Sequence, residues 1–346
     1  MIKEAIAALV EGHNLSAADA ETVMREIMAG EASQAQIGAF LTALRIKGET
    51  IDEIAGCARA MRSLAVPVRP KRTDLVDTCG TGGDRSGTFN ISTTAAFVVA
   101  GARLGVAKHG NRSVSSQSGS ADVLQALGLN LDLDAHTVAD SIDTVGFGFL
   151  FAPKLHPAMR HAIGPRREMG IRTVFNVLGP LTNPAGAQTQ VMGIYAAHLT
   201  APIAEVLQTL GSRAAYVVHG ADGLDELSTT GPNRAAFFDA AHGGEVVEET
   251  LDAMSLGIPR AALADLRGGT AAENAELTRR VLAGERGPRR DVVLFNAAAA
   301  LVAGGKATDL REGVATAADA IDGGAAAAVL ARVVEFSNDH APHPVP

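Results

Sequence analysis

Apolar side chains recur at the spacing of amphipathic helices through the first 65 residues of the chain. One segment can be capped by Asn14 or Ser16, and another begins at Thr50 with Glu53 three residues later, the pattern of a capping box. Between them, a segment ends at Gly48 and has an expected apolar face made of Ile37, Phe40, Leu41, Leu44 and Ile46. The sequence therefore predicts a small bundle of short helices.

The pattern changes after Pro67 and Pro70, where we expect a hinge between two domains. Apolar strands are expected to begin at residues 75, 105 and 214, and helices are expected over 90–105 and 120–129. Residues 291–305 are expected to begin as a strand and to continue as a helix. Strands that alternate with helices predict an α/β fold with a mostly parallel central sheet and helices on both of its faces.

Composition and charge exclude several classes of protein. A chain of 346 residues, 47% of them hydrophobic, can bury a sizeable core in about two domains. The net charge of -8 argues against nucleic acid as the main partner, because proteins that bind phosphate backbones usually have a basic surface. Cys57 and Cys79 are too few for a disulfide framework or a structural zinc site, which favours a reducing cytoplasm. We see no signal peptide and no apolar run of membrane-spanning length, so we expect no contact with a membrane.

Glycines follow the first predicted strand. In "GTGGD", Gly80, Gly82 and Gly83 have no Cβ atoms, so their backbone N–H groups can approach an anion closely. The stretch lacks the lysine of a Walker A motif and the spacing of the dinucleotide-binding pattern. An ordinary turn between a strand and a helix explains the same glycines, and both interpretations remain open at this point.

Two further loops favour an anion. Residues 90–93 open a helix whose N-terminal N–H groups, together with the Ser92 and Thr93 hydroxyls, attract negative charge, although Asn90 or Ser92 can also act simply as an N-cap. In residues 108–120, Lys108 offers a cation, and a solvated surface loop is the alternative. The hydroxyl donors expected in that loop are Ser116, Ser118 and Ser120. Because loops that follow parallel strands meet at one edge of a sheet, the three loops together favour a phosphate site.

Two other stretches carry charged side chains. "GADGLDELS" supplies Asp222, Asp225 and Glu226 after a later strand, which suits Mg²⁺, an ion that keeps waters and borrows phosphate oxygens. A solvated acidic loop is the alternative. Residues 156–184 carry arginines that can grip a carboxylate in bidentate fashion, although most are expected to be solvated: Arg160, Arg166, Arg167 and Arg172.

In their order along the chain, these stretches resemble the motifs of anthranilate phosphoribosyltransferases from about residue 5 to the C-terminus. The motifs are "DTCGTGGD", "FNIST", "KHGNRSVSSQSGSAD", "HPAMRHAIGPRREMGIRTVFNVLGPLTNPA" and "GLDELS". The resemblance implies transfer of the phosphoribosyl group from phosphoribosyl pyrophosphate to the amine of anthranilate in tryptophan biosynthesis. Pyrimidine nucleoside phosphorylases share the architecture but lack the pairing of "KHGNR" with "GPLTNP", and they are the alternative.

The resemblance also implies an organisation. A helical domain of residues 1–70, with helices at about 156–184 packed on it, is joined to an α/β domain of residues 71–155 and 185–346. The α/β domain is expected to bind phosphoribosyl pyrophosphate with a pair of Mg²⁺ ions, and the helical domain is expected to form a homodimer.

Roles at individual positions follow from the same resemblance. The residues expected to hold phosphoribosyl pyrophosphate are Gly80, Gly82, Gly83, Asp84, Thr88, Asn90, Ser92, Thr93, Lys108 and Ser120. Those expected to hold magnesium are Ser92, Asp225 and Glu226, and those expected to contact anthranilate are Gly80, His109, Asn111 and Arg166. No residue is assigned as a catalytic acid or base, and stabilisation of charge by Lys108 and Mg²⁺ is the expected source of catalysis.

Overall fold

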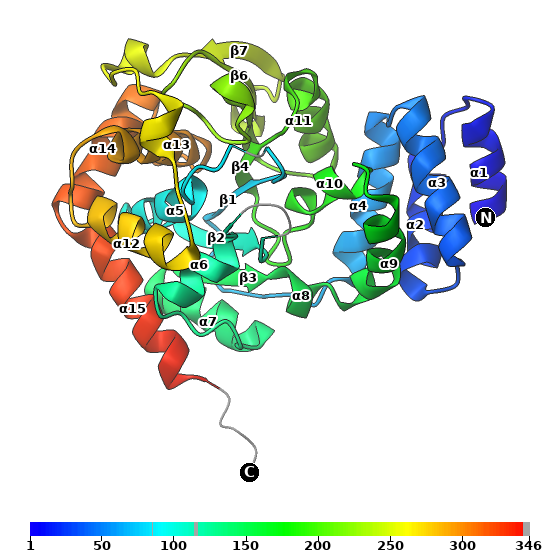
Figure 1. Cartoon of the computed structure of the whole chain (residues 1–346), viewed down its shortest axis with the longest axis horizontal. Coiled ribbons are helices and arrows are strands. Elements are labelled where there is room, and N and C mark those ends of the chain that lie inside the picture. The colour runs from blue at the N-terminus through cyan, green and yellow to red at the C-terminus, as the bar shows by residue number, and fades with distance from the viewer. Residues whose placement is uncertain (85, 114–116, 342–346) are drawn as a thin grey trace.

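The structure is a computed structural model that describes residues 1–84, 86–113 and 117–341. A helical bundle lies beside a larger α/β unit, with the N-terminus at the outer edge of the bundle (Figure 1). Helix α9 (Arg160–Met169) comes from far along the chain and packs on α2 and α3. The N-terminal helices of the bundle are α1 (Ile2–Val10), α2 (Ala17–Ala29), α3 (Gln34–Lys47) and α4 (Ile51–Leu64). The predicted bundle is confirmed.

Side-chain caps explain where the bundle helices begin. The Ser16 hydroxyl, and not Asn14, accepts the bond from the Asp19 N–H that caps α2. The capping box predicted from Thr50 and Glu53 is present at the start of α4. These bonds satisfy N–H groups that have no partner within the helix.

Ile46 corrects the predicted apolar face of α3. Its side chain is 81% exposed, whereas Ile37 is buried. With 3.6 residues per turn, position 46 lies half a turn round the helix from position 37, so the assignment of Ile46 to the buried face was wrong. Val10, at the end of the neighbouring helix α1, is also 73% exposed.

In the described part of the chain, the α/β unit is built on one seven-stranded sheet with the order β3-β2-β1-β4-β5-β6-β7. The strands are β1 (Leu75–Gly80), β2 (Gly105–Gly110), β3 (Phe147–Phe151), β4 (Thr189–Gly193), β5 (Ala214–His219), β6 (Asn233–Asp239) and β7 (Val247–Leu251). The first five strands in the sheet order are parallel, and β6 and β7 pair antiparallel. The predicted mostly parallel sheet is confirmed, although β3, β4, β6 and β7 are additional to the strands predicted.

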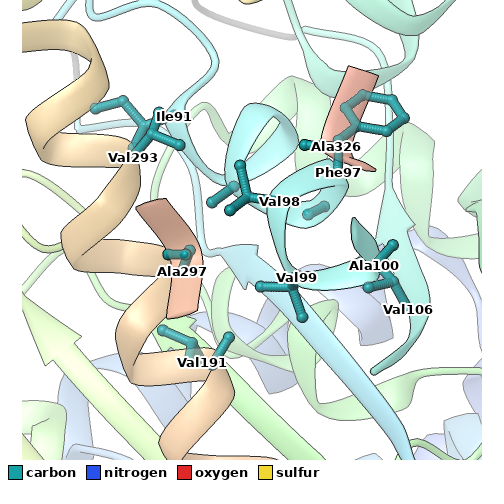
Figure 2. Packing of buried hydrophobic residues seen from close by; sticks show 14 of the residues in the cluster. Ile91, Phe97, Val98, Val99, Ala100, Val106, Val191, Val293, Ala297 and Ala326 are labelled. Carbon is teal, nitrogen blue, oxygen red and sulfur yellow. The ribbon is translucent and has the colours of Figure 1, made fainter. Parts of the chain in front are cut away.

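Helices cover both faces of this sheet, as the sequence predicts. Helices α5 (Ile91–Gly101) and α13 (Pro288–Ala303) lie on one face, where Val98 and Ala297 pack beside Val191 of β4 (Figure 2). Helices α7 (Ala135–Val145) and α11 (Thr200–Thr209) lie on the other. The remaining α-helices are α6 (Ser120–Ala126), α8 (Ala152–Leu155), α10 (Phe175–Leu178), α12 (Ala271–Leu282), α14 (Leu310–Asp322) and α15 (Ala325–Asp339).

Helix α13 corrects the strand expected at residue 291. The whole of Pro288–Ala303 is helical, and it begins with a proline at its first position. The valines near its start, Val292 and Val293, suggested a strand because such residues favour sheets. The helix is buried nearly all round, so no polar face reveals a helical period in the sequence.

The chain crosses between the bundle and the α/β unit three times, and the three crossings lie close together. The Val66 N–H donates to the Leu155 carbonyl at 2.8 Å, and the Val68 N–H donates to the Pro184 carbonyl at 3.1 Å. The three connections therefore lie side by side, next to Pro67. Elsewhere, the Arg62 guanidinium of α4 donates to the Leu210 carbonyl at the end of α11, which links the bundle to the sheet helices.

Among the described residues, no single helix has both the length and the apolar character needed to cross a membrane. Only α14 and α15 meet that criterion together, and the chain bends by 61° between them.

Candidate active site

A cavity of about 570 Å³ opens between the ends of β1 and β2 on one side and residues 166–180 on the other. The sequence-predicted residues that line it are Gly80, Gly82, Gly83, Ser92, Lys108, His109, Asn111, Ser120 and Arg166. These residues come from four separate stretches of the chain. The structure therefore places the anion-favouring loops and two of the four arginines, Arg166 and Arg172, around the same space.

Four other predicted residues lie beside the cavity and do not line it: Asp84, Thr88, Asn90 and Thr93. Thr88 forms a β-bridge with Arg267. The Thr93 side chain is fully buried, so only its backbone N–H, in the first turn of α5, is oriented like the other N–H groups of a helix N-terminus. Ser116 lies outside the described residues.

The glycine turn after β1 adopts a conformation that favours glycine. Gly82 and Gly83 have φ angles of 70° and 75°, in the left-handed region. The Gly82 N–H donates to Asp225 Oδ2 at 2.5 Å. A Cβ on Gly80 would lie 2.3 Å from that same oxygen, so the turn can approach the acidic loop only without a side chain there. The turn is therefore more than a simple connection between a strand and a helix.

Asn90 is not the side-chain cap that the sequence allowed. Its side chain makes no capping bond to α5. Instead, Asn90 Oδ1 accepts from Asn274 Nδ2 at 2.9 Å, and Asn90 Nδ2 donates to the Ser118 carbonyl at 3.3 Å. The Asn274 Oδ1 atom in turn accepts from the Gly269 N–H, so a segment nearly 180 residues away supports the start of α5. Asn90 thus joins two of the predicted anion loops.

Asp225 and Glu226 face the start of α5. The Ser92 N–H donates to Glu226 Oε1 at 3.1 Å, which places the predicted metal ligands Ser92, Asp225 and Glu226 together. Among the described residues, Glu226 Oε2 has no hydrogen-bond partner, although it is inaccessible to solvent. All three residues line a small second cavity of about 10 Å³, which shares Cys79 and Ser92 with the main one. Oxygen donors beside an unpaired carboxylate oxygen fit a hard divalent cation such as Mg²⁺.

Burial disfavours the ionised form of both carboxylates in the absence of a cation. It raises the pKa of Asp225, and the charge of Asp84 raises it further. Burial also raises the pKa of Glu226 to about 8, with the charge of Asp225 acting in the same direction. The third acidic residue of this loop, Asp222, lies on the turn Ala221–Gly223 and does not line either cavity. In the part of the chain that the structure describes, no cluster of three or more His, Cys, Asp or Glu residues could hold a metal.

Lys108 reaches across the sheet from β2. Its ammonium is almost fully buried, donates to the Thr78 carbonyl and lies 3.5 Å from the Ser92 hydroxyl. Burial lowers the pKa of Lys108, while the charges of Asp77 and Glu226 oppose that shift. The residue therefore presents a cation between the end of β1 and the start of α5.

His109, the next residue, pairs with His156, which sequence reasoning missed. His109 Nδ1 lies 3.1 Å from the Gly179 carbonyl, and its Nε2 lies 3.2 Å from His156 Nε2. Burial lowers the pKa of His109 to about 3 and that of His156 to about 4, so both rings are neutral at pH 7. A carbonyl only accepts, so His109 carries its proton on Nδ1 and accepts the Nε2–H of His156 on its other nitrogen.

Residues 166–180 form the opposite wall of the cavity. The Arg166 guanidinium lies 4.9 Å from the centre of the Phe175 ring, and burial lowers its pKa. Arg172 stacks 4.0 Å from the centre of the Tyr195 ring and donates to the Gly83 carbonyl at 2.5 Å. The other two arginines, Arg160 and Arg167, are exposed and do not line the cavity.

Several residues of this wall were missed from the sequence. They include Phe175, Gly179 and Pro180, all of which line the cavity. Arg172, which the sequence offered among the four arginines without assigning it to a substrate, lines the cavity as well. Phe175, Gly179 and Pro180 lie in the stretch "TVFNVLGPL", a hydrophobic pattern that indicates a buried helix ended by Gly179 and Pro180 and gives no sign of a ligand site. That helix is present as α10, but it lasts only four residues. One indication of their role was present in the sequence, because these residues lie inside a motif already noted for its arginines.

Comparison with known proteins extends over nearly the whole chain. Residues 72–327 match the a/b domain of a glycosyl transferase family, and residues 3–65 match the helical bundle domain of a glycosyl transferase family. The anthranilate phosphoribosyltransferase of Moorella thermoacetica is 58% identical over 336 residues, which cover 97% of this chain and 98% of that protein.

Solved structures agree with these matches. The crystal structure of anthranilate phosphoribosyltransferase from Thermus thermophilus is 46% identical and superposes with a TM-score of 0.91, covering 96% of this chain and 99% of the other. The enzyme from Saccharomyces cerevisiae in complex with PRPP and Mg is 28% identical, with a TM-score of 0.88 and 98% of both chains covered. Both the sequence and the arrangement of the two units are thus shared with these proteins.

The raised pKa of the acidic pair predicts a pH-dependent stability in the metal-free protein. Between the ordinary value for Glu226, 4.5, and its folded value of about 8, the folded protein keeps a proton that the unfolded chain has released. Unfolding is therefore favoured as the pH rises. We expect metal-free protein to lose about 1–3 kcal/mol of unfolding free energy between about pH 5 and pH 8. Denaturant melts at several pH values, with EDTA or with Mg²⁺, measure this loss.

The control is the double variant Asp225→Asn with Glu226→Gln, which has no charge to develop at these positions. Its pH profile should be flatter than that of the wild type, and Mg²⁺ should stabilise it less. Matching profiles with and without Mg²⁺ for the wild type and the variant would show that these carboxylates bind no cation.

Proposed function

The chain belongs to the anthranilate phosphoribosyltransferases, and on that premise we propose how its residues divide the reaction between them. It transfers the phosphoribosyl group from phosphoribosyl pyrophosphate (PRPP) to the amine of anthranilate. The products are N-(5-phosphoribosyl)anthranilate and pyrophosphate, in tryptophan biosynthesis. The observation that carries the proposal is the single cavity with Lys108 and the glycine turn on one wall and Arg166 on the other.

We place the diphosphate of PRPP between the glycine turn, the start of α5 and Lys108. The Gly83 backbone, the Thr93 N–H in the first turn of α5 and the Lys108 ammonium are donors, and the dipole of α5 favours negative charge at that end. In the structure described, the Gly82 and Ser92 N–H groups donate to Asp225 and Glu226. Supporting roles fall to Asp84, Thr88, Asn90, Thr93 and Ser120. Asn90 fits such a role because it is bonded to both neighbouring segments.

Magnesium would be held by Ser92, Asp225 and Glu226, and when bound it supplies positive charge that stabilises the departing pyrophosphate. The unpaired Glu226 Oε2 atom, among the residues described, supports this assignment. The related Saccharomyces cerevisiae enzyme was solved with PRPP and Mg. We propose a pair of Mg²⁺ ions for each chain. Such ions are commonly bound by one or two protein carboxylates together with the phosphate oxygens of the substrate.

Anthranilate would lie between Arg166 and the ends of β1 and β2. The Arg166 guanidinium is planar and suits the planar carboxylate of the substrate. Gly80 and Asn111 line the same space, and the His109 ring forms part of the wall. Held by its carboxylate at Arg166, the aromatic acid can point its amine toward the sugar.

The chemistry requires stabilisation of charge more than transfer of a proton. An aryl amine is a weak nucleophile, so the bond to pyrophosphate breaks largely before the new C–N bond forms. The Lys108 ammonium and the glycine-turn N–H groups act on the charge that develops on the leaving group. Both ring nitrogens of His109 are already in hydrogen bonds, to the Gly179 carbonyl and to His156, so this neutral histidine is no general base in the structure described. Alignment of the two reactants contributes several kcal/mol more, up to about 7–11 in the best intramolecular cases.

We propose that residues 1–70 with the helices at about 156–184 move as one unit relative to residues 71–155 and 185–346. Gly179 and Asn183 lie at the pivot of this movement, because they are bonded to β2 and β1. The three connections between the two units lie together at Val66–Leu155 and Val68–Pro184, which is the arrangement that a hinge requires. Closure would bring Arg166 toward the diphosphate loops and exclude water that hydrolyses the activated sugar.

We also propose a homodimer formed through the helical domain. The apolar side chains of Val10 and Ile46 support it, because they are 73% and 81% exposed on helices α1 and α3, which pack on each other. The thiols of Cys57 and Cys79 are both free, in keeping with the reducing cytoplasm that we predict.

A direct assay separates this function from that of a pyrimidine nucleoside phosphorylase. Purified protein with Mg²⁺ and PRPP should abolish the fluorescence of anthranilate as product forms, and omission of either PRPP or Mg²⁺ should prevent the change. Phosphorolysis of thymidine should stay at background. Phosphorolysis without consumption of anthranilate would contradict the assignment.

The position of Arg166 predicts a substrate-specific loss. A charge-assisted hydrogen bond contributes about 1.5–3 kcal/mol, so Arg166→Ala should raise the KM for anthranilate about 10- to 100-fold. The KM for PRPP should change much less. Arg167→Ala is the matched control, because the neighbouring guanidinium is exposed and outside the cavity. Equal increases in both KM values for Arg166→Ala would remove our assignment of the carboxylate site.

The position of Lys108 predicts the opposite selectivity. Lys108→Ala removes the cation between β1 and α5, so calorimetry should show PRPP binding weakened about 10- to 100-fold in the presence of Mg²⁺. Unaltered affinity for PRPP would refute the contact with the diphosphate.

A further inference from the structure

The sheet separates between β1 and β2 just below the active site. The two strands pair only at Leu75 with Gly105 and at Val76 with Val106. Beyond that point β1 continues to pair with β4, and β2 continues to pair with β3. The backbone groups of β2 that face β1 therefore need other partners, since buried N–H and C=O groups are almost always paired.

Two buried side chains supply those partners. Asp77 Oδ1 accepts from the His109 N–H at 3.0 Å, and Asn183 Nδ2 donates to the Ala107 carbonyl at 2.8 Å. The two side chains also bond to each other, from Asn183 Nδ2 to Asp77 Oδ2 at 2.8 Å. Asp77 is fully buried and Asn183 is 8% exposed. The Asp77 carboxylate and the Asn183 amide thus take the place of backbone hydrogen bonds between β1 and β2.

The N–H that Asp77 holds belongs to the peptide bond between Lys108 and His109. Successive side chains of a strand point to opposite faces of the sheet. Lys108 accordingly reaches the Thr78 carbonyl and the Ser92 hydroxyl, whereas His109 reaches the Gly179 carbonyl and His156. One backbone position thus sets the place of the ammonium on one face and of the imidazole on the other.

We propose that Asp77 and Asn183 are positioning residues that hold the peptides on the two sides of Lys108, and thereby align the diphosphate site with the anthranilate site. Asp77 holds the Lys108–His109 peptide through its N–H, and Asn183 holds the Ala107–Lys108 peptide through its carbonyl. The inference rests on the proposed function, which assigns Lys108 to the diphosphate and His109 to the anthranilate path. It gives a role to the "GPLTNP" stretch, whose asparagine is Asn183.

The charge of Asp77 supports this role. Burial raises the pKa of Asp77, and the charge of Lys108 lowers it, so the two buried charges favour each other's ionised forms. A buried ammonium without a compensating anion is unfavourable, and Asp77 contributes most among the anionic groups that stabilise the charged form of Lys108. The same carboxylate that fixes the peptide also helps to keep its lysine charged.

The principal test is Asp77→Asn. The new amide can still accept from the His109 N–H, but it places a donor against Asn183 Nδ2 and removes the negative charge near Lys108. We expect kcat/KM to fall about 10- to 100-fold for both PRPP and anthranilate, because both sites share one peptide.

The matched control is Thr189→Val on the other side of β1. The Thr189 hydroxyl is buried and donates to the Leu75 carbonyl at 2.7 Å, so its loss destabilises the same strand away from the cavity. We expect a similar fall in Tm with kcat/KM within about twofold of the wild type. If Asp77→Asn lowers Tm and leaves kcat/KM unchanged, as the control does, the positioning role is wrong.

Two further measurements complete the test. If Asp77→Asn does not fold, Asn183→Ala serves instead, because it keeps the Asp77 carboxylate. It removes the bonds of the Asn183 side chain to Asp77 Oδ2, to the Ala107 carbonyl and to the Ala185 N–H. It should lower kcat/KM for both substrates, and retention of wild-type values would overturn the inference.

Lys108→Ala tests the diphosphate contact itself. If Lys108→Ala weakens PRPP binding but Asp77→Asn leaves kcat/KM unchanged, the positioning role of Asp77 is wrong and the proposed function still stands.

Discussion

The acidic loop after β5 reaches the ends of β1 and β4 only because positions 80 and 193 carry no side chain. A Cβ on Gly193 would lie 1.4 Å from the Asp225 backbone oxygen, and one on Gly80 would lie 2.3 Å from Asp225 Oδ2. At this close approach the carboxylate accepts the Gly82 N–H, so the glycine turn and the acidic loop fix each other. The relation between the phosphate loops and the candidate metal ligands therefore depends on contact between backbones, which no larger residue permits.

This contact concentrates charge in a region with little water. Asp225 and Glu226 are neighbours, the charge of Glu226 acts on the buried ammonium of Lys108, and burial raises the pKa of both carboxylates. Such an arrangement opposes folding, because buried charges need partners. In the function that we propose, a divalent cation would supply the charge that the carboxylates lack, and the diphosphate would supply the charge that Lys108 lacks. The same feature that lowers the stability of the metal-free protein would thus favour binding of the substrate.

Sequence reasoning located the parts of the site that have an obvious chemical character. Lys108 was found because a cation in a glycine-containing loop after a predicted strand suggests an anion, whereas Arg166 was singled out from the four arginines only by the family resemblance. His156 was missed, because its function depends on contact with a histidine 47 residues earlier in the chain. Asp77 was missed as well, because a single acidic residue inside an apolar strand shows nothing of the gap that it fills. For the fold, alternation of strands and helices predicted the sheet, whereas the all-round burial of Pro288–Ala303 concealed its helical period.

The two substrates of this reaction must meet with their reacting atoms about 3–3.5 Å apart, so the two walls of the cavity need a common reference. Neighbouring residues of one strand provide it, since Lys108 and His109 point to opposite faces and share one peptide bond. Asp77 holds that peptide from β1, and Asn183 holds the preceding carbonyl from the segment that follows the arginine wall. A displacement of either partner would move the cation and the imidazole together. Because β1 separates from β2, the Asn183 side chain can enter from outside the sheet and help to set the positions of both substrates.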